Sequence, residues 1–257
     1  MFDIVLIVMT AIAVVCFVAL YFIPAGYGKM VDAKWGFAFN NKVGWCIMEC
    51  PTVLTSITFI IMSCYFASFS LEAYIARILV LSFFILHYTY RSFIFPFLLR
   101  GKSQMPLTIV IMGFLFNTIN SVLICYWTFY IAKPEFYSFS YFKSPLFIIG
   151  AFIFLLGFVA NIDSDAYIRS LRQKGDTKHY FPRRHLYKYV SSANYLSEIL
   201  EWLGFALLTN NPAAYLFVIW TSANLIPRSH AIYKKYKSLF PEEVKSSRIK
   251  RIIPFIY

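Results

Sequence analysis

The sequence predicts an all-α integral membrane protein with seven transmembrane helices that enclose an internal cavity. Of its 257 residues, 60% are hydrophobic and only 14% are charged, and the mean hydropathy is +0.64. Soluble domains are typically about 45–50% apolar and about 25% charged. The apolar residues also come in long runs, which excludes a disordered chain and argues against a soluble globule.

Each apolar run is read as one span, because about 20 helical residues cross a hydrocarbon core about 30 Å thick. The first run carries no internal charge and lacks a basic leader, so it predicts a span and not a cleavable signal. The second run begins at Pro51, and the third is interrupted by Arg77, His87 and Arg91. The last two runs are shorter and are joined by a turn at residues 209–212. The predicted spans are residues 3–23, 51–69, 71–99, 106–131, 145–161, 195–208 and 213–226.

The basic residues predict how these spans are oriented. With the N-terminus outside, twenty of the 24 Lys and Arg residues fall in segments on the inside of the membrane. Cytoplasmic loops are enriched in Lys and Arg, so we expect the C-terminus in the cytosol. The net charge of +12 therefore requires no nucleic-acid partner. Since no repeat or linker divides the chain, we expect a single membrane domain over residues 1–257.

The cysteines and histidines form no metal-binding pattern. Cys46 and Cys50 are spaced CxxxC without a second pair, and the four histidines are scattered. Zinc sites need ligands clustered at short spacing. We therefore expect no metal and interpret the five cysteines as small hydrophobic residues.

Polar residues recur at helical spacing where lipid would otherwise be expected. In the third span, Tyr88, Arg91 and Phe95 fall at i, i+3 and i+7, on one helix face. Ionisable residues at membrane depth are costly and usually face a cavity or another helix. The alternative is that Arg91 reaches the membrane interface and Tyr88 packs in the core.

Two further polar stripes contain amides and carboxylates. The first is Asn161, Asp165, Arg169 and Arg172, and the second is Asn194, Glu198 and either Glu201 or Trp202. An ion-pair ladder along one helix explains Asp165 and Arg169 but not Asn161, which lies in the apolar zone. The carboxylates of the second stripe need a basic partner from another helix.

Glu49 lies in an apolar context directly before Pro51. Burial disfavours the charged form of a carboxyl group, so we expect a protonated side chain that can donate a hydrogen bond. The alternative is an ordinary charge at a helix N-terminus. Together with the stripes, Glu49 predicts a polar cavity open to the cytosol, in an enzyme or a carrier. A cavity lined by Arg, Asn and Trp suits a cofactor with phosphates and an aromatic ring.

Four segments around these residues resemble the steroid 5α-reductase family. They are LHYTYRSFIFPFLLRGK (86–102), NIDSDAYIRSLR (161–172), YVSSANYLSEILEWLGFAL (189–207) and IIPFIY (252–257). The third segment is the most specific. The resemblance implies a seven-span enzyme that uses NADPH to reduce the C4–C5 double bond of a 3-oxo-Δ4 steroid.

The resemblance also implies roles for single residues. Glu49 and Tyr88 would be catalytic and would hold the substrate carbonyl, whose oxygen becomes negatively charged during hydride attack. Losing one donor to such an oxygen costs roughly 10²–10³ in rate. The residues that would line the cofactor pocket are Arg91, Lys102, Asn161, Asp165, Arg172, Asn194, Glu198, Trp202, Arg228 and Tyr236. No Rossmann fingerprint is present, since the GxG at residues 26–28 lacks a third glycine.

Three positions depart from the family pattern. Phe95 stands where a tyrosine is often found, His230 lies unusually close to Arg228, and residues 180–186 are more basic than usual. We assign no cofactor role to His230. The basic stretch would alter any lid over the cofactor.

Other functions fit parts of the pattern. An enoyl or another sterol reductase would differ around Glu49 and Tyr88. Residues 184–187 faintly resemble a motif of isoprenylcysteine-type methyltransferases but lack its proline, and a transporter often shows a two-fold repeat. We expect a monomer in contact with membrane lipid, in the endoplasmic reticulum of a eukaryote or the inner membrane of a bacterium.

Overall fold

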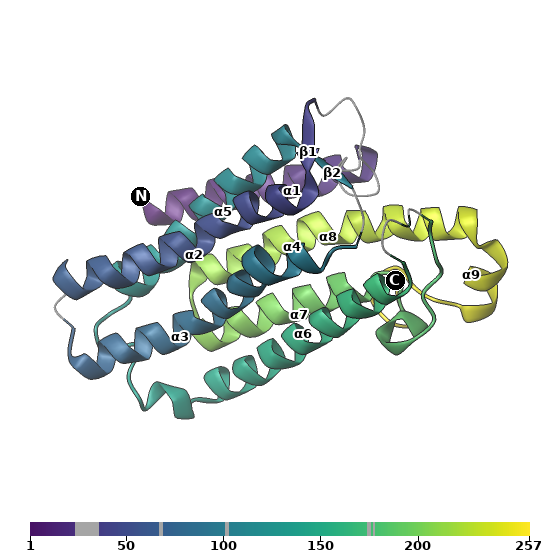
Figure 1. The fold of residues 1–257 in the computed structure, drawn as a ribbon. Helices are drawn as coiled ribbons and strands as arrows, with labels where there is room; N and C mark the ends of the chain where they lie inside the picture. Colours follow the sequence, from purple (N-terminus) through teal and green to yellow (C-terminus); the bar gives the residue numbers. More distant parts are fainter. Residues whose placement is uncertain (24–35, 67–68, 101–102, 174–175, 177) are drawn as a thin grey trace. The chain divides into compact units, whose positions relative to one another are not determined.

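The computed structural model is built mainly of helices (Figure 1) and describes residues 1–23, 36–66, 69–100, 103–173, 176 and 178–257. Five helical segments within this part of the chain are long and apolar enough to cross a membrane. They are Phe2–Phe22 (α1), Asn41–Phe66 (α2), Leu71–Leu98, Leu107–Ile131 and Pro145–Ser170 (α6). The prediction of a mainly helical chain with helices suited to a membrane is confirmed at this level.

Two of these segments contain a π-helical turn. The segment after α2 consists of Leu71–Thr89 (α3), the π turn Tyr90–Ile94 (η3) and Phe95–Leu98 (α4). The next consists of Leu107–Tyr126 (α5) and a second π turn, Trp127–Ile131 (η4). π turns are rare and occur frequently at functional sites.

The last two predicted spans correspond to Ala193–Thr209 (α7) and Pro212–Leu239 (α8). With 17 residues, α7 is shorter than the five apolar segments, and α8 is long but less apolar. A short helix, Pro241–Ser247 (α9), follows α8. The count of seven spans, their orientation and the internal cavity therefore stay predictions.

The start of α2 differs from the predicted boundary because Pro51 lies inside the helix. Proline has no N–H, so the carbonyl of Ile47 loses its helical hydrogen bond, and the Sγ of Cys50 lies 3.7 Å from that oxygen. Membrane helices tolerate proline where neighbouring groups satisfy the freed backbone. Glu49 is thus in the middle of α2, and its interpretation as a charge at a helix N-terminus is wrong.

The chain also contains a small sheet that the all-α prediction lacked. Ala38–Asn40 (β1) pairs antiparallel with Gln104–Pro106 (β2), with Ala38 opposite Pro106. The backbone N–H of Asn41 also donates to the carbonyl of Ser103 at 3.3 Å. These contacts tie the beginning of α2 to the beginning of α5.

The chain divides into two compact units. The first comprises residues 1–25, 153–203 and 216–257, and the second comprises residues 26–152 and 204–215. Within the first unit, α6 and α7 approach closely at Gly157, where a Cβ atom would lie 2.5 Å from the backbone nitrogen of Glu201. Small residues commonly allow such close approach of membrane helices. We describe the candidate site unit by unit.

Candidate active site

In the second unit, Asn117 of α5 links the two predicted catalytic residues. The Tyr88 hydroxyl donates to Oδ1 of Asn117 at 3.1 Å, and Nδ2 of Asn117 donates to Oε2 of Glu49 at 3.2 Å. Nδ2 also donates to the backbone carbonyl of Met48 at 2.8 Å. All three side chains are buried. The predicted pair of Tyr88 and Glu49 is therefore part of a group of three.

A close approach of α2 and α5 makes this contact possible. Gly113 lies one turn before Asn117 on α5, and a Cβ atom there would come within 2.3 Å of Cγ of Met48. The missing side chain at Gly113 leaves room for Met48. The amide of Asn117 can then reach the backbone of α2 next to the proline-containing turn.

Aromatic rings pack against Tyr88, which lies near the end of α3. Its ring packs edge-on against Phe84 with 5.0 Å between centroids, and Phe84 stacks on Phe205 at 5.2 Å. Phe84 and Phe205 are fully buried. Hydrogen bonds in such low-dielectric surroundings are stronger than in water, and this applies to the bond of the Tyr88 hydroxyl.

Arg91 lies in η3 and is enclosed by aromatic rings of the second unit. Its guanidinium carbon is 4.8 Å from the ring centre of Trp45 and 4.4 Å from that of Phe95. Its exposed fraction is 9%. The phenylalanine at position 95 thus provides an apolar face for the cation, and the structure places Arg91 inside the protein.

In the first unit, the two predicted amide stripes meet. Nδ2 of Asn161 donates to the backbone carbonyl of Asn194 at 2.8 Å, and Nδ2 of Asn194 donates to Oδ1 of Asp165 at 3.1 Å. The hydroxyl of Tyr187 donates to Oδ1 of Asn194 at 3.2 Å. These bonds hold the first turn of α7 against α6. They join three predicted site residues and add Tyr187.

Two other predicted residues lie further along α7. Trp202 is 1% exposed and packs against Phe217 of α8 with 4.5 Å between ring centroids. Its ring therefore contributes to helix packing. Glu198 is half-buried, whereas Glu201, the alternative in the same stripe, is fully buried.

Basic residues gather beyond the end of α6. Burial lowers the pKa of the His179 imidazole, and the neighbouring cations Lys235 and Arg172 lower it further. Burial also lowers the pKa of the Arg172 guanidinium, while the Tyr236 phenol acts in the opposite direction. The pKa of Tyr236 is raised to about 12 by burial. An anion at this position would relieve the repulsion among the three basic groups.

Arg228 and His230 of α8 contact aromatic rings. The guanidinium carbon of Arg228 lies 5.7 Å from the ring centre of Tyr195, on the turn of α8 that follows Pro227. Lys102 lies outside the described residues. The ring of His230, for which no cofactor role was predicted, lies 5.5 Å from the ring of Tyr21 between centroids.

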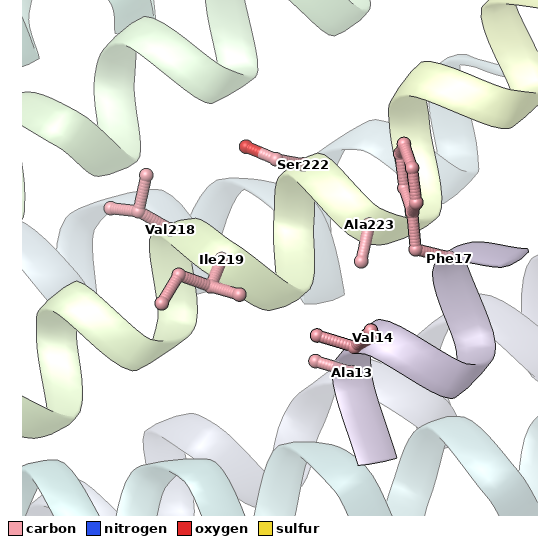
Figure 2. Close-up of a pocket in the computed structure, with 7 residues that line it drawn as sticks. All are labelled: Ala13, Val14, Phe17, Val218, Ile219, Ser222 and Ala223. Carbon is pink, nitrogen blue, oxygen red and sulfur yellow. The ribbon is translucent and has the colours of Figure 1, made fainter. Parts of the chain in front are cut away.

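The loop that carries Tyr187 also borders a pocket of about 550 Å³ in the first unit. Its lining combines opposite charges, Arg183 and Lys188 with Glu242 and Glu243, and Arg183 pairs with Glu243 at 3.5 Å. A second, apolar groove of about 300 Å³ lies between α1 and α8 (Figure 2). Its lining residues are Ala13, Val14, Phe17, Val218, Ile219, Ser222 and Ala223. None of the predicted site residues lines this groove.

Lys250 and the tail that follows it lie against the segment before α7, where the rings of Phe255 and Tyr189 are 5.6 Å apart between centroids. The N–H of Ser191 donates to the carbonyl of Lys250 at 2.8 Å, and the N–H of Lys250 donates to the carbonyl of Tyr189 at 2.9 Å. The hydroxyl groups of Tyr257 and Tyr21 lie 3.1 Å apart. The tail thus supports the start of the helix that carries Asn194.

Sequence reasoning missed Asn117 and Tyr187. A signal for the first exists, because Asn117, Asn120 and Ser121 form a buried polar stripe at i, i+3 and i+4 within the apolar run 106–131. Tyr187 gives no such signal, since it lies in a 3₁₀ turn, His185–Lys188. No cluster of metal-binding side chains is found among the residues that the structure describes.

Known proteins resemble this chain along its length. The sequence profile of the 3-oxo-5-alpha-steroid 4-dehydrogenase family matches residues 103–257. The chain is 32% identical to 3-oxo-5-alpha-steroid 4-dehydrogenase 1 of Bos taurus, over 96% of this chain and 93% of that protein. It is 33% identical to the steroid 5-alpha-reductase DET2 of Solanum lycopersicum, over 100% and 97% of the two chains. It is 36% identical to 3-oxo-5-alpha-steroid 4-dehydrogenase 1 of Homo sapiens, over 70% of this chain and 67% of that protein. The chain therefore belongs to the steroid 5α-reductase family, a family of oxidoreductases.

Proposed function

We propose that this protein reduces the C4–C5 double bond of 3-oxo-Δ4 steroids with NADPH and forms 5α-3-oxosteroids. Membership of the family supports steroid reduction. For this chain, the observation that carries the proposal is the buried group of Tyr88, Asn117 and Glu49, in which one amide links the Tyr88 hydroxyl to the Glu49 carboxyl group. The protein acts as a multi-pass membrane protein, in which α7 and α8 complete seven spans, with the N-terminus outside and the C-terminus in the cytosol.

The reaction needs donors at the C3 carbonyl oxygen, where negative charge develops. NADPH, when bound, supplies the hydride that adds at C5, and a proton adds at C4. The Tyr88 hydroxyl and a protonated Glu49 donate hydrogen bonds to the carbonyl oxygen in surroundings that exclude water. Donors placed in advance where charge develops contribute a large part of the rate.

Two features of the first unit fit a phosphate-bearing cofactor. Lys235 and Arg172 lie close enough to His179 to lower its pKa, and a phosphate would neutralise the positive charge of this group. The amide network of Asn161 and Asn194 provides further hydrogen-bonding groups. Arg91, Glu198, Trp202, Arg228, Tyr236 and Lys102 complete the proposed cofactor residues.

Product analysis with purified protein tests the proposal. Detergent-solubilised protein should oxidise NADPH in the presence of a 3-oxo-Δ4 steroid, and mass spectrometry should detect the 5α-reduced product. The panel includes fatty enoyl thioesters and a sterol with an isolated double bond. Product from the enoyl thioesters and none from the steroid would contradict the assignment in favour of a related enoyl reductase.

Variants of the donor pair test the mechanism. Tyr88→Phe should lower kcat by about 10²–10³-fold, because one donor to the developing oxyanion is lost. Glu49→Gln should also lower kcat. The affinity for NADPH should stay within about twofold in both variants. Tyr65→Phe and Glu135→Gln change the same groups at exposed positions and serve as matched controls. Parallel loss of kcat and cofactor affinity would show that the pair is structural.

A further inference from the structure

We propose that Asn117 is a positioning residue that fixes the direction of both proton donors at the substrate carbonyl. The inference rests on the proposed function, since it concerns the donors assigned there. Asn117 itself lies in α5, whereas Glu49 lies in α2 and Tyr88 in α3. One side chain therefore joins the donors of two other helices.

The contact with Met48 fixes the orientation of the amide. A backbone carbonyl can only accept a hydrogen bond, so the atom 2.8 Å from the Met48 carbonyl must be Nδ2. Oδ1 then faces Tyr88, and an amide oxygen can only accept. The phenol of Tyr88 must consequently be the donor in this bond.

The same orientation selects one oxygen of the Glu49 carboxyl group. Oε2 accepts from Nδ2 of Asn117, so it acts as the carbonyl oxygen of a protonated Glu49. The acid proton is then carried by Oε1. Asn117 thus determines which oxygen of Glu49 is able to donate to a substrate.

Substrate binding requires little movement from this arrangement. When a carbonyl oxygen reaches Tyr88, the phenol proton turns towards it by rotation about the C–O bond. The hydrogen bond to Oδ1 of Asn117 is exchanged for one to the substrate, while Phe84 keeps the ring in place. Such preorganisation lowers the reorganisation needed in the transition state.

Asn117→Leu tests the inference, since leucine has a similar size but neither donates nor accepts. We expect kcat to fall by about 10–10²-fold, the scale of a misplaced catalytic group, with the KM for NADPH within about twofold of wild type. Hydrogen-bond donors also shift the ultraviolet absorption of a bound enone to longer wavelength, and this shift should decrease. The control is Thr118→Val, because the half-buried Thr118 side chain bonds only the carbonyl of Phe114 in its own helix, at 2.8 Å, among the described contacts.

A double-variant background separates positioning from packing. If Asn117 acts through the donors, Asn117→Leu in a Tyr88→Phe, Glu49→Gln protein should lower the remaining rate by less than about threefold. Wild-type kcat in the single variant would overturn the inference. So would an equal loss in both backgrounds, or a parallel loss of NADPH affinity.

Thermal unfolding provides a readout that does not depend on activity. The shifts in melting temperature of Tyr88→Phe and Asn117→Leu should not add in the double variant, because both remove the same hydrogen bond. Additive shifts would refute the inference even if the enzyme were active. A wild-type protein that reduces no enone, but shows this coupling, would instead refute the proposed function.

Discussion

Replacement of Arg77 by alanine should strongly destabilise the second unit, although Arg77 has no place in the proposed site. Its side chain is fully buried in α3. Its guanidinium donates hydrogen bonds of 2.8 to 3.4 Å to the backbone carbonyls of Ala73, Thr128, Ala132, Lys133 and Pro134. Four of these carbonyls belong to η4 and the turn after it, where helix ends leave carbonyls unpaired and the helix dipole favours a cation.

The size of the effect follows from what the substitution leaves behind. Hydrogen bonds to a charged group contribute about 1.5–3 kcal/mol each, but the cost of burying the guanidinium offsets much of their total. Removing one partner from a buried charged network typically costs about 3–5 kcal/mol. For a chain of this size, each kcal/mol lowers the melting temperature by about 2–4 °C. Arg77→Ala should therefore lower it by about 6–20 °C.

Thermal scans of the detergent-solubilised protein at one scan rate measure this shift. Arg77→Lys should have an intermediate effect, because lysine keeps the charge but cannot bond five carbonyls from one ammonium group. Arg184→Ala removes an exposed arginine and is the matched control. A shift of Arg77→Ala no larger than that of the control would refute the reasoning.

Two other outcomes are expected. Gly157→Ala should destabilise the protein by about 1–3 kcal/mol, as overpacking does, because the new Cβ would lie 2.5 Å from the backbone nitrogen of Glu201. Thermal scans of the variant and the wild type test this prediction, and an unchanged melting temperature would contradict it. NADPH affinity should rise as pH falls, since burial and cations lower the pKa of free His179 and a bound phosphate would raise it. Titrations of the protein with NADPH at several pH values measure this dependence, and NADH, which lacks the 2′-phosphate, is the control. An equal pH dependence in His179→Gln would show that His179 is not the titrating group.

The fold was predictable where the lipid bilayer alone determines the secondary structure of a segment. A continuous apolar run of about 20 residues predicts a helical span, and five of the predicted runs have this form in the structure. The start of α2 was not predictable from Pro51, because proline ends helices in water but is tolerated where neighbouring groups satisfy the freed carbonyls. The end of α8 was also missed, since its last turns are polar and carry no hydropathy signal.

The candidate site was predictable where its residues follow helical periodicity. Asn161 and Asp165 share a face of α6 because they are four residues apart, and the structure shows Asn194 bonded to both. Asn117 was not predicted because its stripe contains no charged residue, unlike the stripes of Asn161 and Asn194, although a buried amide can be equally decisive. Tyr187 depends on a 3₁₀ turn whose position no sequence period indicates.

The two arginines of the third span show why composition cannot separate a structural cation from one proposed to bind a cofactor. Arg77 donates to five backbone carbonyls, so its donors are used within the protein. The guanidinium carbon of Arg91 lies 4.8 Å from the ring centre of Trp45 and 4.4 Å from that of Phe95, and these aromatic faces stabilise its charge.

The aromatic surroundings of Arg91 and its place among the proposed cofactor residues predict opposite effects for matched substitutions of the two arginines. Arg91→Met should weaken NADPH binding by about 10–10²-fold, which corresponds to one hydrogen bond between charged groups. The same change should alter the melting temperature less than Arg77→Met does, because two aromatic faces also accommodate an apolar side chain. Arg77→Met should show the reverse pattern, with a large loss of stability and nearly unchanged cofactor affinity in the protein that remains folded. Equilibrium titration and thermal scans of both variants decide the matter, and equal ratios of the two effects would show that the surroundings of an arginine do not determine its role.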